Sequence, residues 1–222
     1  MGFVAAAARL GELGQARGMA SGLGHLRFRC TSCGNCCRDL RVPLTHADLR
    51  RLVDATGRPA SQFVAWLPTR EVDLIGEPGS LVLLDREGGH ALMALAQRDG
   101  ACVFLGADQR CGVYSARPGN CRVYPFAASF GPRGGIRRLR LLAGTDCAYA
   151  RDGDNDPHAL RAADEARWAE HREYLARISQ WNRAQRHRAL LGRRLQGARE
   201  FLAFLGFPER EPLGERPALQ AD

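Results

Sequence analysis

The chain has 222 residues, enough to bury a hydrophobic core without covalent cross-links, so its eight cysteines are not needed as structural staples. Its formal charge is +8, and because lysine is absent all 32 basic residues are arginines. No apolar run reaches the roughly 18 residues of a membrane span, and the amino terminus lacks the apolar centre of a secretory signal. We therefore expect a cytoplasmic protein without a membrane partner, in which thiols stay reduced and clustered cysteines bind metal.

Composition and motif density divide the chain into four expected segments. Residues 1–25, rich in Gly and Ala, predict a disordered leader, and residues 208–222 predict a disordered tail. Residues 26–152 contain every cysteine and predict a metal-binding domain, and residues 153–207 predict a helical appendage. The expected fold class is α+β: a small metal-stapled cysteine domain with a short antiparallel sheet, followed by two amphipathic C-terminal helices.

Helix signals follow the first group of cysteines. The sequence from Thr45 to Asp48 resembles a capped helix start and Gly57 is a stop signal, so we expect a helix over 45–56. Residues 61–67 predict a second short helical piece before Pro68.

The character of the sequence changes after Ser80. Three apolar runs are separated first by Gly88-Gly89 and then by Arg98-Asp99-Gly100, which predicts three short antiparallel strands. A further strand is expected over 137–143.

Beyond residue 157, apolar residues recur at three- and four-residue spacing. They predict two helices, roughly 158–184 and 187–205, that pack on the cysteine domain or on a second copy of the chain.

The strongest chemical signal is the set of eight cysteines. We expect all of them to be metal ligands: Cys30, Cys33, Cys36, Cys37, Cys102, Cys111, Cys121 and Cys147. Cys30-x2-Cys33-x2-Cys36 aims three thiols at one point, and Gly34 allows the positive φ that such a wrap needs. This spacing resembles that of ferredoxins, in which a remote cysteine is the fourth ligand of a four-iron cubane. It also suits a tetrahedral zinc site.

Cys37 adds a constraint, because adjacent cysteines point their side chains in different directions in most backbone conformations. We therefore expect Cys36 and Cys37 to serve different metal positions, either in two centres or in one polynuclear site. Which of the remote cysteines completes which position stays open.

Three histidines near the cysteines are weaker ligand candidates, since a lone histidine is more often a surface or capping residue: His25, His46 and His90.

Arginines form a positive block with no acidic residue between Gln109 and Thr145. They are Arg110, Arg117, Arg122, Arg133, Arg137, Arg138 and Arg140. Four thiolates around zinc, or around an oxidised four-iron cubane, leave a net charge of about −2, which is costly in a low-dielectric site. We expect Arg117 and Arg122 to lie next to the metal-bound thiolates and to offset this charge.

The motifs resemble those of a known family. Cys30-Thr-Ser-Cys33-Gly34-Asn-Cys36-Cys37, followed by Cys111-x2-Tyr114-x2-Arg117-Pro118-x2-Cys121-Arg122-x2-Pro125, looks like the CxxCxxCC or YkgJ-like cysteine-cluster proteins of bacteria and archaea. The resemblance covers about residues 27–150 and implies zinc or iron chelation by the shared cysteines. A related cysteine-cluster architecture occurs in flagellin lysine methylases, so the resemblance leaves an enzymatic role open.

Three functions fit these patterns. The first is a metal-binding protein with one or two cysteine-ligated centres, iron-sulfur (a four-iron, four-sulfur cluster) before zinc, in an electron-transfer, sensing or metal-handling role. The second is a modifying enzyme such as a protein methyltransferase, although we find no nucleotide-binding glycine motif. The third is a zinc module that docks nucleic acid through Arg110 to Arg140. We expect the first, with no catalytic residues and no nucleic-acid partner; a protein partner and the oligomeric state stay open.

Overall fold

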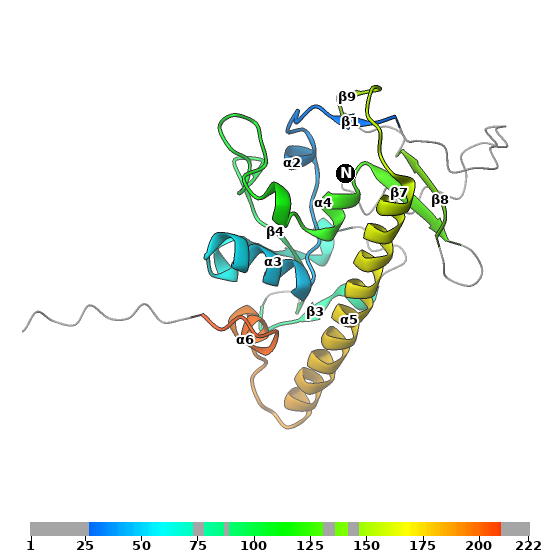
Figure 1. The fold of residues 1–222 in the computed structure, drawn as a ribbon. Coiled ribbons are helices and arrows are strands. Elements are labelled where there is room, and N and C mark those ends of the chain that lie inside the picture. The colour runs from blue at the N-terminus through cyan, green and yellow to red at the C-terminus, as the bar shows by residue number, and fades with distance from the viewer. Residues whose placement is uncertain (1–26, 73–77, 87–88, 131–135, 142–146, 210–222) are drawn as a thin grey trace, which may run out of the picture.

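A computed structural model describes residues 27–72, 78–86, 89–130, 136–141 and 147–209 (Figure 1). The helices are α2 (Cys36–Asp39), α3 (His46–Thr56), α4 (Gly119–Val123), α5 (Pro157–Leu190) and α6 (Ala198–Phe204). The strands are β1 (Arg29–Cys30), β2 (Val64–Pro68), β3 (Val82–Leu83), β4 (His90–Leu95), β5 (Gln97–Arg98), β6 (Ala101–Cys102), β7 (Phe126–Phe130), β8 (Ile136–Leu141) and β9 (Tyr149–Ala150). This mixture of helices and short antiparallel pairs confirms the α+β class. The predicted leader, 1–25, and most of the predicted tail, 208–222, lie outside the described residues.

The largest sheet has three antiparallel strands in the order β2, β4, β3. Its central strand, β4, is buried on both faces, so alternate side chains enter two different apolar clusters. Met93 and Leu95 belong to the main core, whereas Leu92 and Ala94 pack with Leu67 in a smaller cluster. Two of the three antiparallel strands predicted after Ser80 are therefore present in this sheet, as β3 and β4.

Two short antiparallel pairs complete the strand pattern. β5 and β6 form a hairpin that turns at Asp99 and Gly100, both with positive φ (51° and 75°), as the primed turns of tight hairpins require. β7 pairs with β8, which contains most of the strand predicted over 137–143. β7 itself was absent from the sequence prediction.

The second helical piece predicted over 61–67 is wrong. Ala60–Gln62 forms a single 3-10 turn, and Val64–Pro68 is strand β2. Its aromatic and branched side chains suit a pleated surface, and β2 pairs with β4 from Val64 opposite Leu95 to Pro68 opposite Ala91. Pro68 is tolerated because β2 is an edge strand and needs no further ladder partner.

The C-terminal helices differ from their predicted lengths. α5 continues to Leu190, beyond the predicted end at 184, and α6 is correspondingly short. Gly192 is the reason for the later break: it takes a left-handed φ of 66°, and its N–H donates to Ala189 O at 3.0 Å while that of Arg193 donates to Arg188 O at 2.9 Å. This pattern of two bonds is the Schellman ending of a helix. Within the described residues, none of the helices combines the length and hydropathy that crossing a membrane requires.

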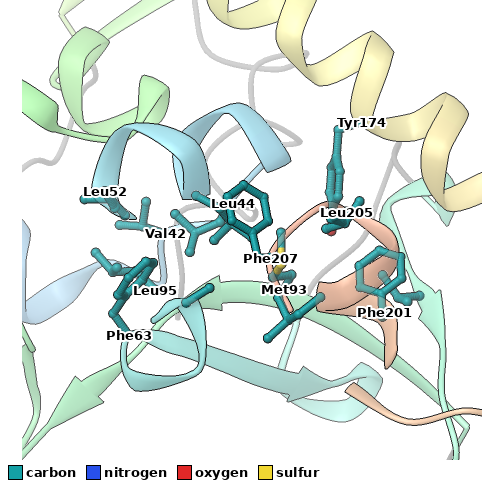
Figure 2. Close-up of a cluster of buried hydrophobic side chains, with 14 of the residues drawn as sticks. Val42, Leu44, Leu52, Phe63, Met93, Leu95, Tyr174, Phe201, Leu205 and Phe207 are labelled. Atoms are coloured by element: carbon teal, nitrogen blue, oxygen red, sulfur yellow. The ribbon is translucent and has the colours of Figure 1, made fainter. Parts of the chain in front are cut away.

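The helices after residue 157 share one hydrophobic core with the cysteine domain. Figure 2 shows Leu52 of α3, Met93 of β4, Tyr174 of α5 and Phe201 of α6 in a single cluster. Polar groups on α5 also cover the edge of β3. Trp181 donates to Leu83 O at 2.8 Å, and Asn182 accepts from Leu83 N and donates to Leu81 O, each at 2.8 Å. Thus α5 packs on the hydrophobic core and also covers the edge of the sheet at β3, which would otherwise be exposed.

Asp48 joins the start of α3 to the start of α4. The predicted capped start is present, in the form of a capping box: the Thr45 hydroxyl accepts from Asp48 N at 3.2 Å, and Asp48 accepts from Thr45 N at 2.8 Å. The carboxylate, whose residue is 2% exposed, also accepts from Gly119 N at 2.8 Å and from Arg51 at 2.6 Å. Arg51 in turn forms a two-bond ion pair with Glu170 of α5. Three helices therefore meet at this carboxylate.

Replacing this carboxylate should destabilise the fold. Asp48→Asn removes the charge and turns one acceptor oxygen into a donor that faces backbone or guanidinium N–H groups. We expect a loss of about 3 kcal/mol in the free energy of unfolding. Asp54→Asn, on the exposed side of the same helix, is the matched control and should change it by less than about 0.5 kcal/mol. Urea unfolding followed by circular dichroism measures both; equal effects of the two substitutions would contradict the bracing role of Asp48.

Gly119 permits close packing of α4 on α5. A Cβ at this position would lie 2.9 Å from Cγ of Arg167, a side chain held by Asp164 at 2.6 Å and by Asn120 at 3.2 Å. Because Arg167 is fixed in this way, Gly119→Ala should push the two helices apart and cost about 1–3 kcal/mol in urea unfolding. Gly79→Ala is the control, since its nearest neighbour would be Leu175 at 3.8 Å, an ordinary contact. A Gly119→Ala chain as stable as that control would show that the helices have room to adjust.

Candidate metal centre

The first group of cysteines extends from the end of β1 through a turn to the start of α2. Ser32 and Gly34 both have positive φ, 56° and 74°, which reverses the chain twice within a few residues. The turn is closed by Cys37 N donating to Gly34 O at 3.0 Å. A Cβ on Gly34 would lie 3.2 Å from Gln109 O, so the second cysteine region also packs against this glycine. The positive φ predicted for Gly34 is confirmed.

Cys102 and Cys111 lie at the two ends of one folded loop. Leu105 N donates to Cys102 O at 2.9 Å, and Leu105 forms an isolated antiparallel bridge with Cys111. Gly112 N then donates to Phe104 O at 2.8 Å. The loop therefore brings Cys111 back beside Cys102, at the level where α2 packs on β6.

Cys121 is carried by α4, whose position is fixed from both sides. Pro118 is the N-cap residue, and the N–H of Gly119 bonds to Asp48. Asn120 donates to Pro43 O at 3.1 Å and accepts from Arg167 at 3.2 Å. The short helix is thereby tied to the segment before α3 and to α5, which holds Cys121 close to α2.

Cys147 reaches the first cysteines through strand pairing. β9 follows it directly and pairs with β1, so that Tyr149 lies opposite Cys30. The Thr31 hydroxyl donates to Ala148 O, and Arg29 forms an ion pair with Asp152 at 2.8 Å. This short β1–β9 strand pair, the β1–β9 ribbon, brings together residues that lie more than a hundred positions apart in the sequence.

All eight predicted ligands line one cavity of about 440 Å³. All eight are free thiols, with Cys30 exposed and the other seven partly buried. The rest of the wall is largely apolar and includes Phe28, Leu40, Val113 and Phe126. The structure therefore brings together the complete set of cysteines that the sequence singled out; that they ligate metal stays a prediction.

The donor set of the cavity suits a soft metal. Thiolates select zinc, copper(I) and iron-sulfur clusters over hard cations. Of the predicted histidine ligands, His46 and His90 are absent from the residues that line the cavity, and His25 lies outside the described residues. Within the described parts of the chain, no three His, Cys, Asp or Glu side chains are yet arranged to hold a metal ion.

Contacts between thiols and burial shift their pKa values. A hydrogen bond with Cys37, together with burial, raises the pKa of Cys36, against which the charge of Arg117 acts. A hydrogen bond with Cys102 raises the pKa of Cys37 to about 11, and the same bond lowers the pKa of Cys102. Burial raises the pKa of Cys121 and, with the nearby Cys33 and Cys30, raises that of Cys147 to about 11. These four thiols therefore lose their protons less readily than a free thiol does.

The two predicted neighbouring arginines brace the Cys121 segment. Arg117 stacks on Tyr114, with its guanidinium carbon 3.8 Å from the ring centroid, and donates to Cys121 O at 3.5 Å. Arg122 donates to Arg117 O at 2.9 Å and to Ser115 O at 3.5 Å. Both side chains thus satisfy backbone carbonyls of the loop between Cys111 and Cys121 while keeping positive charge beside the cavity. Of the remaining block, Arg110 is exposed and Arg133 lies outside the described residues.

Some residues that shape the cavity had no recognisable signal in the sequence. Asp48 was identified only as a capping residue, yet it also anchors the helix that carries Cys121. Residues 153–155, assigned by the sequence to the helical appendage, line the cavity instead. Gly153 lies so close to Phe28 that a Cβ would stand 1.9 Å from its carbonyl oxygen, and Asn155 donates to the same oxygen.

Residues 29–147 match the CxxCxxCC family, described as "Putative zinc- or iron-chelating domain". The match covers more than half of the chain, contains all eight cysteines, and agrees with the resemblance read from the motifs. The chain belongs to this family, and chelation of zinc or iron is the property that the family's description gives. Neither the curated proteins nor the solved structures contain a match.

Metal affinity should rise with pH, because thiolates bind metal and the pKa values of Cys36, Cys37, Cys121 and Cys147 are raised in the metal-free chain. Each displaced proton makes the apparent affinity about tenfold stronger per pH unit below these pKa values. We expect Zn²⁺, used as a probe that needs no sulfide, to bind at least about a hundredfold more tightly at pH 8.5 than at pH 6.5. Competition against a chelator of known protonation measures this, and a pH-independent affinity would contradict it.

Proposed function

We propose that this cysteine cavity holds iron-sulfur and that the protein acts in electron transfer, sensing or metal handling. The observation that carries the proposal is that eight thiols, without a histidine among the described lining residues, surround one cavity of about 440 Å³. Metal binding in general is what the family describes. The iron-sulfur assignment is our proposal and follows from the volume and the number of donors.

The volume favours a cluster over a single zinc ion. Structural zinc sites are tetrahedral, use four ligands with Zn–S distances of about 2.3 Å, and close around the ion. Such a site uses half of the eight thiols and little of the space. A cubane contains inorganic sulfide as well as iron, so it needs both a sulfur-rich wall and room inside that wall.

Hydrogen bonds to the sulfur atoms also fit an iron-sulfur site. Ser32 N lies 3.4 Å from the Cys30 Sγ and donates to it, and Phe104 N donates to the Cys102 Sγ at 3.5 Å. Hydrogen bonds of this kind stabilise thiolates and help to set the reduction potential of a cluster. A bound cluster would supply one-electron chemistry, while these backbone donors would tune its potential.

Charge near the cavity supports an anionic occupant. The positive charge of Arg117 acts on Cys36, and its guanidinium also bonds to the backbone of Cys121. Four thiolates around an oxidised four-iron cubane leave a net charge of about −2, which a low-dielectric wall would otherwise penalise. Arg117 offsets part of this charge, and Arg122 holds Arg117's own carbonyl in place.

One side of the cavity is open to a redox partner or a metal donor. Cys30 is exposed, and Tyr114, which also lines the cavity, is 54% exposed. A centre reachable from solvent suits electron transfer, sensing or metal exchange. The two other functions predict something different: a protein methyltransferase requires binding of S-adenosylmethionine, and a nucleic-acid module requires binding that weakens steeply with salt. We expect neither in calorimetric titrations of the loaded protein.

Anaerobic purification of the full chain tests the proposal. We expect a brown protein that contains iron and acid-labile sulfide in about equal amounts, with broad visible absorption that bleaches on reduction. A matched preparation from zinc-supplemented cells should retain the same iron and sulfide. A colourless protein with stoichiometric zinc and no sulfide, obtained in both preparations, would contradict the iron-sulfur assignment.

A further inference from the structure

The eight thiols do not contact one another evenly. Two contacts join the first cysteine motif to remote cysteines: Cys37 is hydrogen-bonded to Cys102, and Cys33 is hydrogen-bonded to Cys147. The second half of the motif is therefore linked to the segment of Cys102, and the first half to the segment of Cys147.

The first group of thiols consists of Cys37 and three remote cysteines. Besides its bond to Cys37, Cys102 interacts electrostatically with Cys111 and Cys121. Cys111 also interacts with Cys37 and with Cys121. Each member of this group therefore lies near the others, and together they number four, the ligand count of one cubane or one zinc ion. We call Cys37, Cys102, Cys111 and Cys121 the inner set.

The second group is assembled around the β1–β9 ribbon. Cys147 interacts electrostatically with Cys33, Cys30 and Cys36, in addition to its hydrogen bond with Cys33. Cys30 and Cys147 lie near the same end of the ribbon, because Tyr149 pairs with Cys30. We call Cys30, Cys33, Cys36 and Cys147 the outer set.

Cys36 is the thiol between the two groups. It is hydrogen-bonded to Cys37 and interacts with Cys121, so contacts alone draw it inward. Two arguments place it in the outer set: the inner set already has four donors, and Cys36 continues the two-residue spacing of Cys30 and Cys33. Because Cys36 contacts Cys37, the inner and outer sets of thiols lie side by side.

Packing distinguishes the two sets independently of these contacts. Cys102, Cys111 and Cys121 pack against the main hydrophobic core, together with residues of α3, β4 and α5. The outer set is instead held by a two-residue strand pair and by the solvent-exposed ion pair of Arg29 with Asp152. Exposed ion pairs contribute little to stability, so the outer thiols lie on the less firmly held part of the domain.

We propose that the cysteines form two adjacent four-thiol centres, an inner one of Cys37, Cys102, Cys111 and Cys121 and an outer one of Cys30, Cys33, Cys36 and Cys147. This inference rests on the proposed function. The inner centre is part of the core and stabilises the fold. The outer centre lies toward solvent and is the one that exchanges electrons or metal.

Metal analysis of cysteine variants tests this division in the full, anaerobically purified chain. Cys147→Ser and Cys30→Ser should each halve the iron and sulfide content, and the double variant should lose no more than either single one. Both should keep the wild-type circular dichroism and urea midpoint. Cys102→Ser and Cys121→Ser should also halve the metal, and they should lower the urea midpoint. Combining Cys147→Ser with Cys102→Ser should remove nearly all of it.

The outcomes separate this inference from the proposal on which it rests. A wild-type chain without iron and sulfide defeats the proposed function itself. A wild-type chain with a single cluster, or single variants that each lose all the metal, leaves that function standing and overturns the two-centre division. If the inner-set variants fail to fold, this agrees with their position in the core. The two-centre division is then tested by the metal content of Cys30→Ser and Cys147→Ser alone. If these two retain all of the metal or none of it, the division is wrong.

Discussion

The carboxylate of Asp48 organises the domain around a single buried charge. A carboxylate that is 2% exposed is stable only when donors surround it, and here Thr45, Arg51 and Gly119 all donate to it. The same bonds fix where α3 begins, where α4 begins and, through Arg51 and Glu170, how α5 lies against both. Since α4 carries Cys121, the geometry of the thiols depends on an electrostatic arrangement that contains no cysteine.

The thiols themselves are brought together by short elements that have little stability of their own. A turn with two positive-φ residues, a folded loop, a five-residue helix and a two-residue ribbon each deliver one or more cysteines to the cavity. Small pieces of this kind usually depend on packing or on a bound metal for their order. The hydrophobic core and α5 supply the packing on one side of the cavity, and the proposed iron-sulfur centres would supply the rest.

Spacing in the sequence predicted the ligand candidates and the role of Gly34, because both are local properties of the chain. The helix of α3 and the hairpin at Asp99-Gly100 were equally local and were predicted well. One error has a non-local cause, since 61–67 became a strand because β4 offered it a partner. The other has a local cause, since α5 extends to Leu190 because Gly192 supplies the left-handed stop. The contact of Asp48 with Gly119, and the division of the cysteines, required three-dimensional neighbours that spacing does not encode.

We propose that the cavity lined by the eight thiols holds a polynuclear iron-sulfur centre. X-ray absorption at the iron edge of the anaerobically purified chain tests it most directly, because the method reports both the atoms bound to the metal and its nearest metal neighbours. Our account predicts a first shell of sulfur alone, followed by an iron-iron shell. A first shell containing nitrogen or oxygen, or sulfur without any metal-metal shell, would contradict it.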